Sequence, residues 1–342
     1  MLHQCAMRQV VFMSDGVDAP GPRYRCVQFF PHFERAGLRC EIYHAYGKLY
    51  NRLLRRPLVG AAYKTITRAK RAVATAVVRP DIMFLQRTAF PQTAIAERIA
   101  HRRGIPMIFD VDDAIYLGPT GAPSRAREKA FRDALRVADH YIAGNQHLAE
   151  VGGVPDKTTV IPTVIDTDRY VPPARRAEGG PVIGWMGTMT NLSRLERVVP
   201  ALERVLRELP DARVRIVSNA DFAPLRGVDR VEQIRWSAAT EIELLQSFDI
   251  GLMPLEDSAV TRGKCAFKMI QYMAVGAPVV VSAVGANVEV IGDHALGYAL
   301  DGFDWTDALL ALARDPDLRA RMGAVGRERA VASYSVRGVL PE

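Results

Sequence analysis

The chain has 342 residues, more than one hydrophobic core usually serves, so its length predicts two domains. With 49% apolar and 24% charged residues, the composition is typical of a soluble globular protein and excludes fibrous and disordered classes. The 45 basic residues outnumber the 38 acidic ones. The resulting net charge of +7 favours anionic partners such as phosphates, nucleic acid or acidic lipid headgroups.

The four cysteines show neither CxxC nor Cys/His metal spacing, which indicates reduced thiols in a cytosolic protein. The chain contains no run of 18 apolar residues, and its first residues, MLHQCAMRQ, lack the apolar segment of a signal peptide. We therefore expect a cytoplasmic protein.

The first elements have the order of a Rossmann-like domain. Residues 10–13 form a short apolar run that predicts a strand, and a loop rich in Gly and Pro follows, which contains Arg23 and Arg25. A helix is expected from Cys26 to Ala36. Because GxGxxG is absent, an NAD site here is weakly supported.

The stretch from His44 to Pro80 is strongly basic and contains no acidic residue. Leucine, valine and isoleucine side chains interleave with the basic ones at roughly helical spacing. This pattern is typical of a surface that binds an anionic membrane or nucleic acid, and the few aromatic residues argue against nucleic acid. A solvated basic face is the alternative. The basic residues are Lys48, Arg52, Arg55, Arg56, Lys64, Arg68, Lys70, Arg71 and Arg79.

A cluster of acids follows the strand predicted at residues 106–109. Asp110, Asp112 and Asp113 stand at the carboxyl end of this strand, where α/β folds bind ligands. Capping of a turn or helix is the alternative role for these carboxylates. The D-V-D-D string superficially resembles a metal site, but no further ligands are visible, so no metal is expected.

A composition break rich in Pro and Gly lies near residues 172–180 and indicates a hinge. Beyond it, strands alternate with helices, which predicts a second Rossmann-like domain with a parallel sheet. The expected strands are residues 182–185, 214–218 and 250–253.

The stretch RGKCAFKMIQYMAVGAPVVVS, residues 262–282, predicts a helix over 264–274, a glycine stop at Gly276 and a buried strand from 279 to 281. Lys264, Lys268 and Gln271 fall at i, i+4 and i+7 and form one polar row on this helix. Two lysines near a helix N-terminus predict a phosphate site. Ion pairs with Glu256, Asp257 or Glu289 are the alternative for these lysines.

This stretch resembles the donor-site signature of the GT-B glycosyltransferases of family 4. The family pattern has two glutamates seven residues apart, and here Gly263 and Gln271 occupy those positions. The resemblance extends to FDVDDAI and to the connector VIPTVIDTDRYVPP, and it is densest from Val182 to Glu289.

The resemblance implies an α/β protein of the GT-B fold: two facing Rossmann-like domains with parallel sheets and an interdomain cleft. The implied organisation is an acceptor-binding domain at 1–172, a hinge at 173–180, a donor domain at 181–325 and a segment at 326–342 that packs back towards the N-terminal domain. The implied activity is transfer of a sugar from a nucleotide-diphosphate-sugar donor to a glycan or lipid-linked glycan, with retention of configuration, in cell-surface polysaccharide synthesis. No cofactor is expected.

The candidate site residues fall into three groups: those that bind the donor, those that bind the acceptor and those that take part in catalysis. The catalytic candidates are Asp112, Asp113 and Lys268; the donor candidates are Gly187, Thr188, Trp236, Lys264, Lys268, Gln271, Gly285 and Glu289; the acceptor candidates are Arg23, Arg25 and Asp110. Residues 44–80 are a candidate surface for an anionic membrane, and no nucleic-acid partner is expected. Two alternatives are a nucleotide-sugar epimerase of the same architecture and a non-catalytic module that binds carbohydrate or membrane.

Overall fold

The computed structural model describes residues 8–16, 19–47, 53, 57–174 and 179–340. The chain forms two compact units, Met1–Thr163 and Val164–Glu342. Each unit is built on a six-stranded sheet in which all paired strands are parallel.

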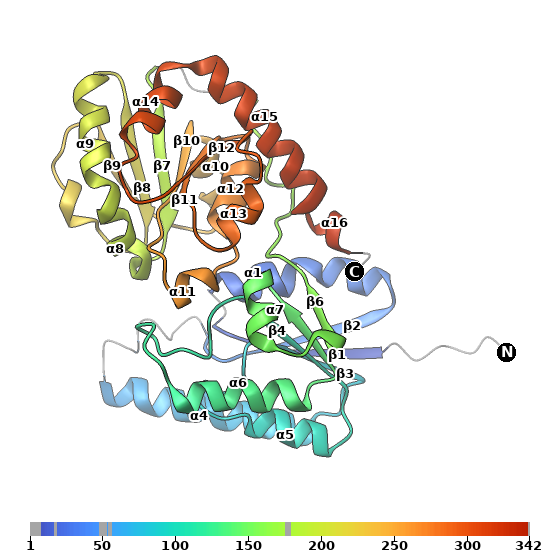
Figure 1. The fold of residues 1–342 in the computed structure, drawn as a ribbon. Helices are drawn as coiled ribbons and strands as arrows, with labels where there is room; N and C mark the ends of the chain where they lie inside the picture. The colour runs from blue at the N-terminus through green and yellow to red at the C-terminus, as the bar shows by residue number, and fades with distance from the viewer. Residues whose placement is uncertain (1–7, 17–18, 48–52, 54–56, 175–178, 341–342) are drawn as a thin grey trace. The chain divides into compact units, whose positions relative to one another are not determined.

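The sheet of the first unit has the strand order β2-β1-β3-β4-β5-β6 (Figure 1). The strands are β1 (Arg8–Ser14), β2 (Leu38–His44), β3 (Ile82–Gln86), β4 (Met107–Val111), β5 (His140–Ala143) and β6 (Thr158–Val160). Most side chains of β1 and β4 are buried, since helices cover both faces of the sheet.

Three helices, α4, α5 and α6, lie along one face of this sheet (Figure 1). The helices of the unit are α1 (Pro20–Arg25), α2 (Phe30–Arg35), α4 (Pro57–Val77), α5 (Ile95–Arg102), α6 (Arg125–Val137) and α7 (Gln146–Gly152), with short 3-10 turns at η1 (Val27–Phe29) and η2 (Pro155–Lys157). Phe12 of β1 packs with Phe30 and Phe33 on the α2 side.

The loop expected before Cys26 is partly helical. Helix α1 begins at Pro20, and a 3-10 turn separates it from α2, so the single helix expected over 26–36 is wrong in its bounds. Proline at the first helical position fixes φ near the helical value and needs no N–H donor there, which explains the early start. Arg23 and Arg25 therefore lie on a helix and not in a loop.

The sheet of the second unit has the strand order β12-β11-β10-β7-β8-β9. The strands are β7 (Val182–Gly187), β8 (Arg213–Ser218), β9 (Val231–Arg235), β10 (Ile250–Met253), β11 (Val279–Ser282) and β12 (Gly297–Leu300). Strands β9 and β12 were not expected from the sequence. The two edge strands are less buried than the central ones: β9 contains polar and charged residues, and β12 contains no β-branched residue, so neither has the β-branched apolar run that marks a central strand.

The helices of the second unit cover both faces of its sheet (Figure 1). They are α8 (Leu192–Leu195), α9 (Val199–Glu208), α10 (Glu241–Gln246), α11 (Ala259–Arg262), α12 (Phe267–Ala274), α13 (Ala286–Ile291), α14 (Thr306–Arg314), α15 (Pro316–Ser333) and α16 (Val336–Val339), with 3-10 turns at η3 (Met189–Asn191), η4 (Glu196–Val198) and η5 (Ala223–Leu225). Trp185 and Trp305 belong to the buried cluster on one face. On the other face Gly251 lies so close to Tyr272 of α12 that any larger side chain would collide with the ring.

Helix α12 begins at Phe267, three residues later than expected. Ala266 adopts a left-handed conformation with φ of 50°, which separates α12 from the short helix α11. The predicted end is confirmed: Gly276 follows the helix with φ of 68°, and β11 begins at Val279. Lys264 consequently lies in a turn, and only Lys268 and Gln271 share the helix.

Residues 164–172 fold with the second unit. Arg327 of α15 donates hydrogen bonds to the carbonyl oxygens of Thr167, Tyr170 and Ala274. Ile165 forms a parallel bridge with Ser335. The hinge at 173–180 stays a prediction, and its residues 175–178 lie outside the described part of the chain.

Candidate functional site

The first unit brings three charged residues to one end of its sheet. The strand order reverses between β1 and β3, since β2 lies on one side of β1 and all later strands lie on the other. Asp15, Arg87 and Asp112 each directly follow one of the strands β1, β3 and β4. Ligands of open parallel sheets bind outside the carboxyl ends of the strands at such a reversal.

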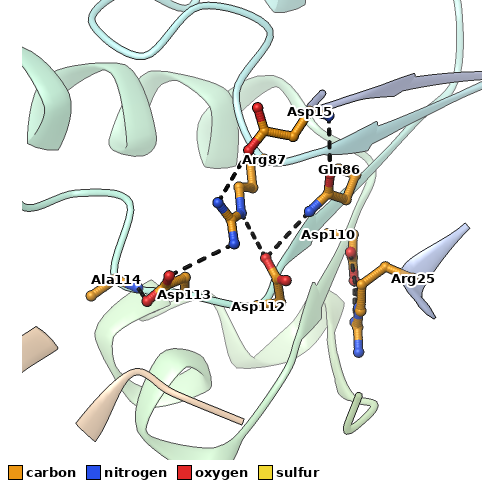
Figure 2. A network of polar contacts seen from close by, with 8 residues as sticks. All are labelled: Asp15, Arg25, Gln86, Arg87, Asp110, Asp112, Asp113 and Ala114. Atoms are coloured by element: carbon orange, nitrogen blue, oxygen red, sulfur yellow. Dashed lines mark hydrogen bonds and ion pairs between the residues drawn. The ribbon is translucent and has the colours of Figure 1, made fainter. Parts of the chain in front are cut away.

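Arg87 is the centre of this cluster (Figure 2). Its Nε lies 2.7 Å from Asp112 Oδ1, its Nη1 lies 3.3 Å from Asp15 Oδ2, and Nη2 lies 3.7 Å from Asp113 Oδ2. Gln86 links the same groups, because its amide nitrogen lies 3.3 Å from Asp112 Oδ1 and its oxygen accepts from the Asp15 N–H at 3.2 Å. One guanidinium thus holds three carboxylates from two loops in fixed positions.

The backbone of Arg87 has φ of 64°, in the left-handed region that a non-glycine residue rarely adopts. The Arg87 N–H donates to the Asp110 carbonyl oxygen at 2.7 Å, which fixes this conformation to the end of β4. Such a conformation costs about 1–3 kcal/mol and persists only where surrounding contacts enforce it. The position is therefore determined by the network around it.

Burial raises the pKa of Asp112, but the charge and hydrogen bond of Arg87 outweigh burial and hold this pKa below its ordinary value. The same carboxylates raise the pKa of Arg87, although burial alone would lower it. Asp112 is therefore an ionised hydrogen-bond acceptor at neutral pH.

Two of the predicted acceptor residues bind each other. Arg25 forms two hydrogen bonds with the carboxylate of Asp110, and its Nη1 donates to the Ile161 carbonyl oxygen at 2.8 Å. Both side chains are buried. Burial raises the pKa of Asp110, and the Arg25 charge opposes that shift. Their geometry is that of a buried ion pair that joins α1 to β4.

The remaining candidates of the first unit lie nearer the surface. Arg23 lies over the ring of Tyr24, with 4.9 Å from its guanidinium carbon to the ring centroid. Asp113 Oδ1 accepts a hydrogen bond from the Ala114 N–H at 3.0 Å, as expected for a carboxylate that stabilises a turn.

In the second unit the strand order reverses between β7 and β10. Gly187 ends β7, and Thr188 follows it in an exposed turn. The hydroxyl of Thr188 accepts from the Asn191 side chain at 2.9 Å, so this turn is held by its own side chains. The carboxyl end of β7 thus presents a short turn at the position where parallel sheets bind ligands.

Lys268 lies beside this turn, in the first turn of α12. A Cβ atom on Gly187 would come within 2.9 Å of Lys268 Cε, and Lys268 Nζ lies 5.8 Å from the centroid of the Trp185 ring. The half-buried Lys268 side chain therefore lies beside Gly187 and the ring of Trp185. Gln271, one turn further along α12, is buried.

Gly285 brings a second loop to the same region. It precedes α13 with φ of 53°, and a Cβ atom there would lie 2.9 Å from the Cα of Arg262. The loop after β11 thus touches the backbone of the turn that leads to Lys264, and only glycine permits this approach. Glu289 is exposed on α13.

Asp257 and Glu256 were alternative ion-pair partners predicted for Lys264 and Lys268. In the structure, both carboxylates contact arginines. Asp257 binds Arg262 through two hydrogen bonds of 2.7 Å, and Glu256 lies 3.6 Å from Arg194.

Trp236 is held by its indole nitrogen. Trp236 Nε1 donates to Glu241 Oε2 at 2.8 Å, and the Tyr170 hydroxyl donates to the other oxygen of the same buried carboxylate. The half-buried ring is thus fixed in orientation.

Sequence reasoning missed Arg87, Asp15 and Gln86. The sequence did contain a pattern that could have indicated two of them. Asp15 and Arg87 each directly follow a strand, as Asp112 does, so this pattern could have placed all three at the same sheet edge. Within the described residues, no group of three or more His, Cys, Asp and Glu side chains is arranged to hold a metal ion. That catalysis needs no metal stays a prediction.

Comparisons with known proteins agree with this architecture. Residues 180–315 match the family model described as glycosyl transferases group 1. A D-inositol 3-phosphate glycosyltransferase of Kribbella flavida is 26% identical over 249 residues, which cover 60% of this chain and 55% of that protein. The chain spans about half the length of the curated relatives it matches.

Solved structures resemble nearly the whole chain. A glycosyltransferase from Rickettsia africae has a TM-score of 0.70 at 16% identity and covers 98% of this chain and 96% of its own. HepE of Anabaena, solved in complex with UDP and glucose, has a TM-score of 0.65 at 15% identity, with 96% of each chain covered.

The fold therefore places this chain among the GT-B proteins, and the predicted α/β class with two Rossmann-like parallel sheets is confirmed. The matched residues 180–315 lie within the second unit, Val164–Glu342. Over residues 180–315 the chain is similar to the glycosyl transferases group 1 family, the resemblance that its sequence predicted.

Proposed function

We propose that the protein is a retaining glycosyltransferase that moves a sugar from a nucleotide-diphosphate-sugar to a glycan or lipid-linked glycan in cell-surface polysaccharide synthesis. The proposal places the enzyme on the cytoplasmic side, where it acts at an anionic membrane surface. Its sequence relative from Kribbella flavida is named as a glycosyltransferase, and the similar HepE structure contains UDP and glucose.

The arrangement of Lys268 against Gly187 is the observation that carries the proposal. When the bond between the sugar and the diphosphate breaks, negative charge grows on the departing diphosphate. A lysine in the first turn of α12, at the carboxyl end of β7, adds its charge to the N–H groups of that helix. Lys264 and the backbone around Gly285 complete the proposed donor site.

The proposed acceptor site lies at the sheet edge of the first unit, where Asp112 and Asp113 follow β4. The transferred sugar forms a bond to an acceptor oxygen as its bond to the diphosphate breaks, and the proton of that acceptor oxygen passes to an oxygen of the departing diphosphate. Asp112, kept ionised by Arg87, accepts a hydrogen bond from the attacking hydroxyl and orients it. Asp113 is the second carboxylate of this side.

A thermal-shift panel with UDP, GDP, dTDP, ADP and NAD tests the donor site first. At about 100 times the dissociation constant, a bound ligand stabilises the protein by about 2.7 kcal/mol, which raises the melting temperature measurably. We expect a shift with one nucleoside diphosphate and none with NAD. A folded protein that responds to no diphosphate would contradict the proposal.

Product analysis then tests the reaction with the matching nucleotide sugar. Release of the nucleoside diphosphate that depends on added acceptor supports transfer. Conversion of the nucleotide sugar without acceptor would identify an epimerase, and binding without any release would identify a non-catalytic module.

A further inference from the structure

Helix α4 of the first unit carries a row of exposed aliphatic side chains. Leu58 is 88% exposed, Ile66 55%, Val73 60% and Val77 70%. At 3.6 residues per turn, these four positions lie within an arc of about 100° on the helix. They form the apolar stripe of α4, which extends over about 30 Å along the helix axis.

The residues between the large side chains complete the stripe. Ala62, Ala69 and Ala76 fall within the same arc and are also exposed. The opposite side of α4, with Arg71 and Thr75, is buried against the rest of the unit. The helix thus buries one face in the protein and leaves a second, apolar face in contact with water.

Such a continuous apolar face is unusual on a protein surface and marks a site of interaction. Packing within the first unit does not cover it, although α4 lies beside α5 on the sheet (Figure 1). A different partner must therefore explain why aliphatic residues occupy these positions.

The basic residues near the apolar stripe favour a negatively charged partner. The stretch from His44 to Pro80 contains nine basic residues and no acidic one. Of these, Arg71 is buried, whereas Lys70 and Arg79 are exposed. A second copy of this chain would bring two basic stretches together, which opposes association. An anionic lipid surface attracts the basic residues and takes aliphatic side chains into its interfacial region.

We propose that the apolar stripe of α4 inserts into the surface of an anionic membrane and docks the first unit there. This inference rests on the proposed function, which needs access to a lipid-linked acceptor. It adds that aliphatic insertion, and not charge alone, holds the protein at the bilayer. Among the described residues, no helix has both the length and the apolar character to span a bilayer.

Vesicle flotation of the full chain tests the proposal. The vesicles contain phosphatidylcholine with or without phosphatidylglycerol, at low salt and at about 0.5 M NaCl, where charge interactions are strongly screened. We expect flotation with the anionic vesicles and a bound fraction that persists in high salt. Complete release by salt, or no flotation at low salt, would overturn the inference.

The variant with Ile66→Gln, Val73→Gln and Val77→Gln tests the stripe itself. Glutamine suits a helix and these side chains are exposed, so the fold is expected to persist. Flotation should fall about tenfold or more because the inserting surface is lost. Val331→Gln, at an exposed valine on α15, is the matched control and should float as the wild type does. Equal flotation of the stripe variant and the wild type would contradict the proposal.

Two further measurements separate the remaining explanations. Sedimentation in the absence of lipid shows whether the stripe joins two copies of the chain. If the wild type is a dimer and the stripe variant is a monomer, the stripe is a dimer interface and the membrane proposal is wrong. The nucleotide thermal shift, measured on the same proteins, reports the donor site of the second unit. A protein that floats but binds no nucleoside diphosphate would contradict the proposed function and leave the docking inference intact.

Discussion

The buried pair of Arg25 and Asp110 provides a sharp test of the structure. Substitution Arg25→Met removes the guanidinium but keeps an unbranched side chain of moderate length at the same position. Asp110 would lose both hydrogen bonds from Arg25 and stay buried, and the Ile161 carbonyl would lose its donor. Loss of one partner from a buried ion pair costs about 3–5 kcal/mol, because the remaining charge has no compensation.

The number of residues in the first unit relates this loss in the free energy of unfolding to a change in melting temperature. For a unit of 163 residues, about 1 kcal/mol corresponds to roughly 2–4 °C in melting temperature. Arg25→Met should therefore lower the transition of the first unit by about 8–16 °C, taking about 4 kcal/mol as the central cost. Thermal and urea unfolding followed by circular dichroism measure the change, and the donor-site ligand identifies the transition of the second unit.

The double variant Arg25→Met/Asp110→Asn is the matched control. A neutral amide next to an apolar side chain removes the uncompensated charge, so most of the lost stability should return. If Arg25→Met alone unfolds within about 1 kcal/mol of the wild type, the two residues do not form the buried pair. The assignment of Arg25 and Asp110 to acceptor binding would then become the stronger explanation.

Three further predictions concern the candidate sites. Lys268→Met should lower turnover about 100-fold with little change in melting temperature, as the loss of one charged contact to the departing diphosphate costs about 3 kcal/mol; wild-type turnover would exclude that role. Gly285→Ala should weaken nucleoside diphosphate binding in calorimetry, since the new Cβ meets a neighbouring backbone, whereas Gly302→Ala, with φ of 69° and open space around it, should bind normally; equal binding by both variants would exclude the close approach as the cause. The folded-state pKa of Asp112 lies below its ordinary value, so its stabilising effect is full above that ordinary value of about 3.9 and is lost as the pH falls through the folded-state pKa. In Arg87→Gln burial is only weakly opposed and raises the pKa of Asp112, so this carboxyl should destabilise the variant at neutral pH, and the lost stability should be regained as the pH falls. Urea unfolding at about pH 7 and about pH 4 measures this, and a difference from the wild type that is the same at both pH values would refute the coupling.

The local order of elements was largely readable from the sequence. Residues 267–282 show why: the helix formers, the glycine at 276 with its left-handed φ, and the β-branched run after Pro278 each act within a few residues. The apolar runs at residues 10–13 and 250–253 likewise predicted strands, and both strands are buried in the structure. Alternation of such strands with helices then indicates parallel sheets.

Errors arose where distant contacts override local preference. Helix α12 starts late because Ala266 is held in a left-handed conformation, which no pattern in the neighbouring residues requires. Similarly, the basic stretch predicted an amphipathic helix, but only the tertiary structure shows which of its apolar residues face solvent: Leu58, Ile66, Val73 and Val77 remain exposed.

Length, strand patterns and the signature of residues 262–282 predicted the class of the protein: two domains with parallel sheets and a donor site after β10. The contacts between distant side chains depend instead on the folded sheets. Arg87 holds Asp15 from 72 positions away and Asp112 from 25, and Arg25 binds Asp110 across 85 positions. Such pairs form because strands far apart in the chain end at one edge of the same sheet, and the strand order that brings them together is a property of the folded sheet.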